Sequence, residues 1–95
     1  LSFLGLTKRY LISGRSMLPL LKEGDIVFLS RKKRDHLQRG SIVVFDDHGN
    51  KKIKRVTTLA EETCIVEGIN AAESEVPHRI DRSQIRGVVR SVLSS

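Results

Sequence analysis

The spacing of short β-forming runs is the feature of this sequence that most restricts its fold. The clearest run is SIVVF at 41–45, and IVFL at 26–29 is a second. Runs this short, bounded by Gly, Asp and Asn, are typical of buried strands joined by turns. No window of the chain has sustained helical periodicity. The sequence therefore predicts an all-β fold of about six short strands, arranged as a small coiled sheet or a partly open barrel.

The length of 95 residues predicts one domain over 1–95, in which 1–11 form an N-terminal tail or strand. With three Phe, one Tyr and no Trp, the core must be built from Val, Ile and Leu. The expected strands lie at 8–12, 26–29, 41–45, 51–58, 64–67 and 84–92. Residues 68–82 are expected to be polar and irregular.

The chain is basic, with a formal net charge of +6. Such a charge favours acidic surfaces, nucleic acid or anionic membrane as partners. Aromatic residues do not alternate with the basic ones, so we expect no nucleic-acid partner. The basic run from Arg31 to Arg34 is interpreted as a solvated loop. Its functional alternative is the docking of an acidic substrate segment or of a membrane surface.

Cysteine and histidine give no sign of a metal centre or a cofactor, and none is expected. Cys64 is the one cysteine, which excludes an intramolecular disulfide, and its place in an apolar strand suggests a small core residue. His36, His48 and His78 lie in polar loops and are interpreted as solvated.

The apolar residues 1–7 are expected to form a docking tail and not a signal sequence. No apolar run approaches the ~20 residues of a membrane span. We therefore expect a cytoplasmic protein that reaches a membrane only through a segment missing upstream.

A serine in a constrained turn is the first candidate for chemistry. Gly14 allows backbone angles that a side chain forbids, and Pro19 keeps Leu18 out of helical angles. Such a turn can expose the Ser16 hydroxyl beside a backbone N–H, which are the nucleophile and oxyanion donor of acyl transfer. The alternative is a solvated serine in an ordinary turn.

A lysine in a strand is the second candidate. Side chains alternate faces along 51–56, so Lys54 shares a face with Lys52 and the apolar Val56. If that face is buried, desolvation favours the neutral amine, which can take a proton from a serine. The alternative is one more solvated charge in a basic hairpin.

The order of the motifs decides between these alternatives. The chain has GRSMLPLL at 14–21, GD at 24–25, RGSIVVF at 39–45 and IKRV at 53–56. In this order they resemble the type I signal peptidase-like serine/lysine proteases, whose pattern is G-x-S-M-x-P-x-L, G-D, G-D-[IV]-V-V-F and [IV]-K-R-V. A fifth element, G-D-N-x-x-x-S, is similar to GINAAES at 68–74. Two positions depart from the pattern, because Ser41 and Ile69 stand where the family has Asp.

The resemblance implies a serine endopeptidase with the coiled all-β fold of signal peptidases and self-cleaving repressors. Ser16 would be the nucleophile, Lys54 the general base and Ser74 the hydroxyl that orients the lysine amine. Met17 and Arg55 are supporting residues of the same motifs, and the Ser16 N–H would contribute to the oxyanion hole. Gly14 stands where some signal peptidases have a serine as the second oxyanion donor. The D-S-R that follows the fifth element in the family is missing.

Within the family, the small size and the SMLPLLK segment at 16–22 are most similar to the nickel-type superoxide dismutase maturation proteases. The expected partner is then a precursor protein whose N-terminal propeptide or leader is removed. Two rivals are a self-cleaving repressor-type domain and a small basic β-barrel that binds nucleic acid. The first normally carries its own cleavage segment upstream, whereas few residues precede Ser16 here.

Overall fold

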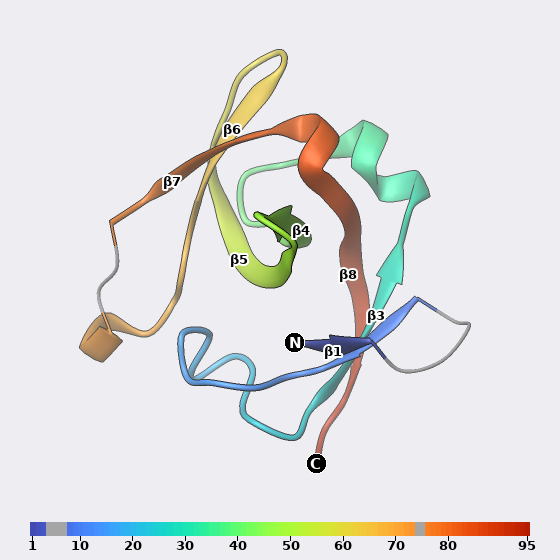
Figure 1. Cartoon of the computed structure of the whole chain (residues 1–95), viewed down its shortest axis with the longest axis vertical. Helices are drawn as coiled ribbons and strands as arrows, with labels where there is room; N and C mark the ends of the chain where they lie inside the picture. The colour runs from blue at the N-terminus through green and yellow to red at the C-terminus, as the bar shows by residue number, and fades with distance from the viewer. Residues whose placement is uncertain (4–7, 74–75) are drawn as a thin grey trace.

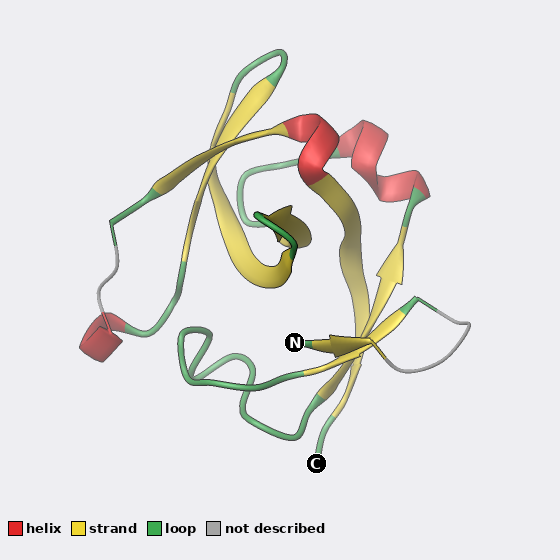
Figure 2. Ribbon diagram, in the orientation of Figure 1, coloured by secondary structure: helices red, strands yellow, loops and turns green. Residues whose placement is uncertain are grey.

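Eight strands form one antiparallel sheet in the computed structural model, which describes residues 1–3, 8–73 and 76–95. The strands are β1 (Ser2–Phe3), β2 (Arg9–Leu11), β3 (Ile26–Ser30), β4 (Ile42–Asp47), β5 (Asn50–Leu59), β6 (Thr63–Glu67), β7 (His78–Asp81) and β8 (Ile85–Leu93). Three short 3-10 helices join them: η1 (Lys32–His36), η2 (Ala71–Glu73) and η3 (Arg82–Gln84). Figure 2 shows that strands and loops make up most of the chain.

The strand order is β1-β2-β3-β8-β4-β5-β6-β7, so β8 returns to lie between β3 and β4. In Figure 1 the curved β4–β5 hairpin lies at the centre, with β3 and β8 on one side and β6 and β7 on the other. The predicted all-β class is confirmed. Within the residues that the structure describes, no helix has the length and apolarity to cross a membrane.

The sequence predicted about six strands, and the two additional ones, β1 and β7, are the two edges of the sheet. β7 lies within 68–82, which were expected to be irregular. Its residues alternate weakly, because Ile80 alone is buried while its neighbours Arg79 and Asp81 are exposed. A strand that pairs on one side only and buries one side chain leaves no clear pattern in the sequence. β1 has two residues, too few for any periodicity.

Two hydrophobic clusters share the central strands. The first contains Leu37, Val43, Phe45, Val56, Cys64, Val66, Ile80, Ile85 and Val88. The second contains Tyr10, Ile12, Met17, Leu21, Val27, Leu29, Val44 and Ile53. β4 and β5 contribute to both, which explains why the run at 42–45 is apolar throughout and does not alternate with polar residues.

Bulges bend the strands where the clusters meet. The register shifts between Val44 and Phe45 in the β4–β8 pair, and between Val56 and Thr58 in the β5–β6 pair. An extra residue on one strand increases its local bend and twist. Figure 1 shows β5 strongly curved. Ile53 and Val56 lie on opposite faces of β5 by alternation, and each joins a different cluster.

The loop between β2 and β3 closes on itself and carries the candidate serine. The Ile12 N–H donates to the Asp25 carbonyl at 2.8 Å, and the Gly24 N–H donates back to the Ile12 carbonyl at 3.0 Å. Gly24 has a φ of +92°, which favours glycine at this return. Met17 and Leu21 are each 2% exposed and fix the loop to the second cluster.

Asp25 holds the end of this loop and is itself 3% exposed. Its carboxylate accepts hydrogen bonds from the Lys22 N–H, the Lys22 ammonium and the Ser95 N–H, each at 3.0 Å. The backbone N–H of Lys22, then that of Ser95, then the Lys22 side chain hold the pKa of Asp25 well below its ordinary value.

Asp25→Asn is expected to lower the melting temperature at neutral pH. The melting temperature of the variant should also fall less than that of the wild type as the pH is lowered. The folded chain has the lower pKa at this position, so the unfolded chain takes up more protons once the pH falls below 3.8. Stability from Asp25 is therefore present above that pH and is lost below it. Thermal unfolding followed by circular dichroism across roughly pH 7 to pH 2 measures both effects. Asp35→Asn, the same change at an exposed position of η1, is the control. An unchanged acid dependence in Asp25→Asn would contradict this account.

Candidate active site

The serine turn is defined by a glycine at its entrance and a buried methionine at its exit. Gly14 has a φ of +84°, and a Cβ built on it would meet no atom within 4 Å. Glycine is therefore favoured here by the backbone angle and not by close packing. Ser16 follows at an intermediate exposure, and Met17 anchors the turn in the core. The Leu18 N–H donates to the Arg15 carbonyl at 3.2 Å and tightens the turn.

The segment after β6 holds this turn from the other side. The backbone N–H groups of Ile69 and Asn70 both donate to the Ser16 carbonyl at 2.8 Å. The Asn70 side-chain amide donates to the Arg15 carbonyl at 2.9 Å. Three hydrogen bonds thus fix two successive peptide groups, and with them the direction of the Ser16 side chain. An ion pair of 3.6 Å between Arg15 and Glu73 of η2 adds a surface contact.

Lys54 is buried in the middle of β5. It is 6% exposed, beside Val56 at 1%, and it pairs across the sheet with Val43 at 0%. The two residues of β5 are buried on one face, as the alternation along 51–56 predicts. Lysine is almost never buried this far unless its amine has a partner or a function. The interpretation of Lys54 as a solvated hairpin charge is therefore wrong.

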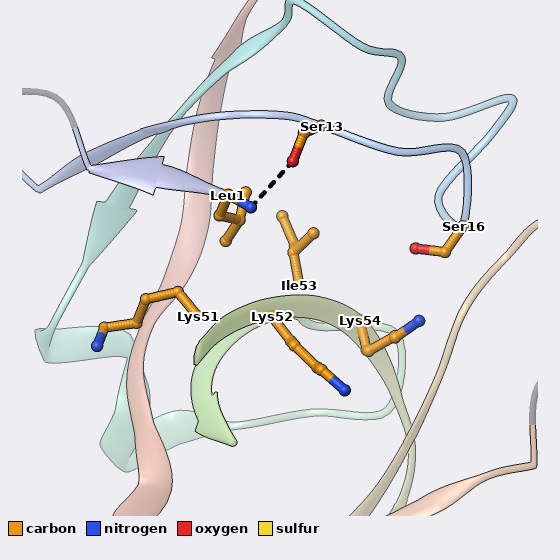
Figure 3. A pocket seen from close by; sticks show the side chains of 7 residues that line it. All are labelled: Leu1, Ser13, Ser16, Lys51, Lys52, Ile53 and Lys54. Atoms are coloured by element: carbon orange, nitrogen blue, oxygen red, sulfur yellow. Dashed lines mark hydrogen bonds between the residues drawn. The ribbon is translucent and has the colours of Figure 1, made fainter. Parts of the chain in front are cut away.

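Gly68 brings the serine and the lysine to one place. A Cβ built on Gly68 would lie 2.9 Å from the Ser16 carbonyl oxygen, 3.3 Å from the Ser16 Cβ and 3.5 Å from the Lys54 Nζ. An atom at the Cβ position of Gly68 would therefore be in van der Waals range of both the Ser16 Cβ and the Lys54 Nζ. Figure 3 shows the Ser16 hydroxyl and the Lys54 amine at the same end of the pocket.

The pocket beside the pair is small, with a volume of about 170 Å³. It is lined by Leu1, Ser13, Ser16, Lys51, Lys52, Ile53 and Lys54. The Ser13 hydroxyl accepts a hydrogen bond from the Leu1 amine at 3.1 Å (Figure 3).

Two lysines of the lining pair with the other strand of the hairpin. Lys51 pairs with Asp46, and Lys52 with Asp47 at 2.7 Å. Hydrogen bonds from these ammonium groups hold the pKa of each aspartate below its ordinary value. These cations of the pocket wall are thus already matched by carboxylates.

The other predicted site residues are Ser74, Met17 and Arg55. Ser74 lies outside the described residues, so its role remains a prediction. Met17 is a core anchor of the turn, whereas Arg55 is exposed and does not line the pocket. Cys64 is buried at 2%, and burial raises the pKa of its thiol, in line with its interpretation as a core residue. Among the described residues, no group of three or more His, Cys, Asp or Glu side chains is placed to hold a metal ion.

Sequence reasoning missed the structural roles of Gly68 and Asn70. Both belong to the element at 68–74, which was used only to locate Ser74. The available signal was that Gly68 and Asn70 match the Gly and the Asn of the fifth motif, on either side of the departure at Ile69. Lys51 and Lys52 were also missed, because they lie outside the compared motif.

The site thus consists of a buried lysine beside a clamped serine turn in an all-β sheet. Comparison with protein families matches residues 1–75 to the signal peptidases, peptidase S26. The chain therefore belongs to this peptidase family. No curated protein and no solved structure matches it.

Gly68→Ala is expected to release the clamp on the serine turn. The new Cβ would meet a backbone oxygen at 2.9 Å, so the segment must shift and the Ile69 and Asn70 N–H groups move away from Ser16. We expect destabilisation of roughly 1–3 kcal/mol. Hydrogen exchange should show lower protection of these two amides.

Gly87→Ala is the matched control, because its Cβ would also lie 2.9 Å from a neighbour, the Leu29 Cβ, but away from the turn. It should lower the melting temperature. Relative to global stability, the protection of the Ile69 and Asn70 amides should stay the same as in the wild type. Equal loss of this protection in both variants would contradict the assignment of Gly68.

Proposed function

We propose that this chain is a serine endopeptidase in which Ser16 is the nucleophile and Lys54 the general base. The observation that carries the proposal is the convergence of the Ser16 side chain and the buried Lys54 amine beside Gly68. Membership of the signal peptidase family supports peptide-bond hydrolysis as the reaction. The neutral form of an amine can accept a proton from a hydroxyl.

The reaction needs only these two groups and water. The Ser16 Oγ attacks the scissile carbonyl carbon while the Lys54 amine takes the hydroxyl proton. The ammonium gives this proton to the leaving nitrogen as the peptide bond breaks, which leaves an ester on Ser16. Lys54 then takes a proton from water, whose oxygen attacks the ester carbonyl. The proton returns to the Ser16 oxygen as the carboxylic acid leaves.

The turn itself supplies oxyanion stabilisation. In the proposed site, the backbone N–H of Ser16 donates to the oxygen that becomes negative in the tetrahedral intermediate. The Asn70 side-chain amide holds the Arg15 carbonyl of the same peptide group, and the Ile69 and Asn70 N–H groups hold the next carbonyl, that of Ser16. A fixed donor costs no reorganisation during the reaction, which is the source of its catalytic value.

The proposed substrate is a cytoplasmic precursor protein that carries an N-terminal propeptide or leader. A pocket of about 170 Å³ favours a small side chain next to the cleaved bond. The similarity of SMLPLLK at 16–22 to the nickel-type superoxide dismutase maturation proteases makes the precursor of that dismutase the first substrate to test. Incubation of the chain alone, read by mass spectrometry, distinguishes this function from self-cleavage of the repressor type.

Ser16→Ala is expected to abolish cleavage of the precursor and to leave the fold intact. The hydroxyl is the nucleophile, so kcat should fall by more than about 1000-fold. The side chain is only partly buried, so the melting temperature should change little. Mass spectrometry of the precursor measures the rate, with Ser13→Ala, a hydroxyl of the same pocket, as the control. Cleavage by Ser16→Ala at a rate close to the wild type would exclude Ser16 as the nucleophile.

Lys54→Met and Lys54→Arg should both be inactive but should differ in stability. Neither methionine nor arginine can act as a neutral base in place of the Lys54 amine, so the rate of precursor cleavage should fall by at least about 100-fold. Methionine leaves an apolar chain beside Val56, whereas arginine places a larger permanent cation at a position that is 6% exposed. We expect Arg to be less stable than Met by roughly 1–3 kcal/mol.

Urea unfolding of the two Lys54 variants measures this difference, and the precursor assay measures the rate. Lys52→Arg, at the next position on the same face, is the control for both. An active Lys54→Arg protein of normal stability would contradict the proposed role of Lys54.

A further inference from the structure

A second hollow lies between η1, the start of β4 and β8, apart from the serine pocket. Its volume is about 570 Å³, within the range of ligand-binding clefts. It is lined by Lys33, His36, Gln38, Arg39, Gly40, Ser41, Ile42, Val88 and Val89. The floor is apolar, because Val88 is buried and Ile42 and Val89 are partly buried. This set of residues is called the η1 groove below.

The rim of the η1 groove is cationic. Lys33 and Arg39 are exposed, and neither forms an ion pair with a residue in the described part of the chain. His36 and the Gln38 amide add further N–H donors at the same rim. No carboxylate occurs among the described lining residues. Ser41, a neutral residue, stands in this lining at the position where the family pattern has Asp.

From this geometry we infer that the η1 groove binds an extended acidic segment of the polypeptide substrate, in which acidic and apolar side chains alternate. The acidic side chains pair with the rim, and the apolar ones cover the floor. Ile42 at the floor pairs directly with Arg55, the residue after Lys54, and these two lie on the face of the sheet opposite to Lys54 and Val43. The biological role of this binding rests on the proposed peptidase function, whereas the binding itself does not require catalysis.

Other anionic partners fit the groove less well. A bilayer would need apolar side chains that project from the surface, whereas here they form the floor of a hollow. Single-stranded nucleic acid binds largely by stacking on aromatic rings, and no aromatic side chain is present among the described lining residues. A polypeptide segment can place both charged and apolar side chains in the groove.

The test uses the Ser16→Ala protein and a fluorescein-labelled peptide of alternating Glu and Leu, with fluorescence anisotropy as the readout. We expect saturable binding that weakens as salt is added, and no binding of the matched peptide of Gln and Leu. Arg39→Glu should weaken binding by at least about fivefold. Arg79→Glu, the same charge reversal on the exposed edge strand β7, should change it by less than about twofold.

Ser41 allows a sharper comparison. Its Oγ accepts a hydrogen bond from the Gln38 N–H at 3.1 Å, and both Asp and Asn can replace that acceptor. Ser41→Asp places a carboxylate in the groove and should weaken binding roughly fivefold or more, whereas Ser41→Asn should bind as the parent protein does. Equal affinities for the Asp and Asn variants, with both folded by circular dichroism, would overturn the inference.

Two further outcomes separate this inference from the proposed function. Peptide binding without cleavage of any precursor by the wild-type chain would contradict the peptidase function and leave the groove assigned. Cleavage of a precursor with an acidic segment at the same KM in wild type and Arg39→Glu would overturn the groove and leave the peptidase. Binding of phosphatidylglycerol vesicles, but not of the peptide, would also overturn it in favour of a lipid surface.

Discussion

The burial of the Lys54 amine is the constraint on which the rest of the structure depends. An ammonium group loses its hydration when it enters an apolar interior, and the cost is offset only by a partner or by release of its proton. Lys54 lies on β5 between two hydrophobic clusters, beside Val56 and opposite Val43. A strand that had only a solvent face and a core face could place a lysine on the solvent face. Ile53 and Lys54, on opposite faces of β5, are both buried, and Lys54 lines the pocket beside Ser16.

The serine turn is held against this amine by backbone groups. The loop from β2 to β3 closes through Ile12 and Asp25, and the segment after β6 donates to the Ser16 carbonyl from the opposite side. Gly68 allows this segment to approach within a distance that any Cβ would prevent. The relative position of a proposed nucleophile and base is thus set by hydrogen bonds and a missing side chain. Such fixed elements can maintain the geometry that acyl transfer requires.

Much of the fold could be predicted from the sequence, because the central strands are apolar and separated by turn residues. The edges could not, since β7 buries little more than Ile80 and pairs on one side only. The burial of Lys54 followed from its alternation with Val56. The clamp on Ser16 did not, because it uses backbone N–H groups of Ile69 and Asn70, and backbone hydrogen bonds leave no mark in side-chain patterns.

The proposed mechanism is tested most directly by mapping the acyl group that it places on Ser16 during turnover. The wild-type chain and Lys54→Met would each be treated with an activated peptide ester, quenched in acid and analysed by peptide mass spectrometry. Treatment with hydroxylamine removes acyl esters but not the amides formed on exposed lysines. The account predicts one hydroxylamine-labile acyl group, on Ser16, in the wild type and very little in Lys54→Met. Equal labelling of Ser16 in both proteins, or a labile acyl group on another residue, would contradict it.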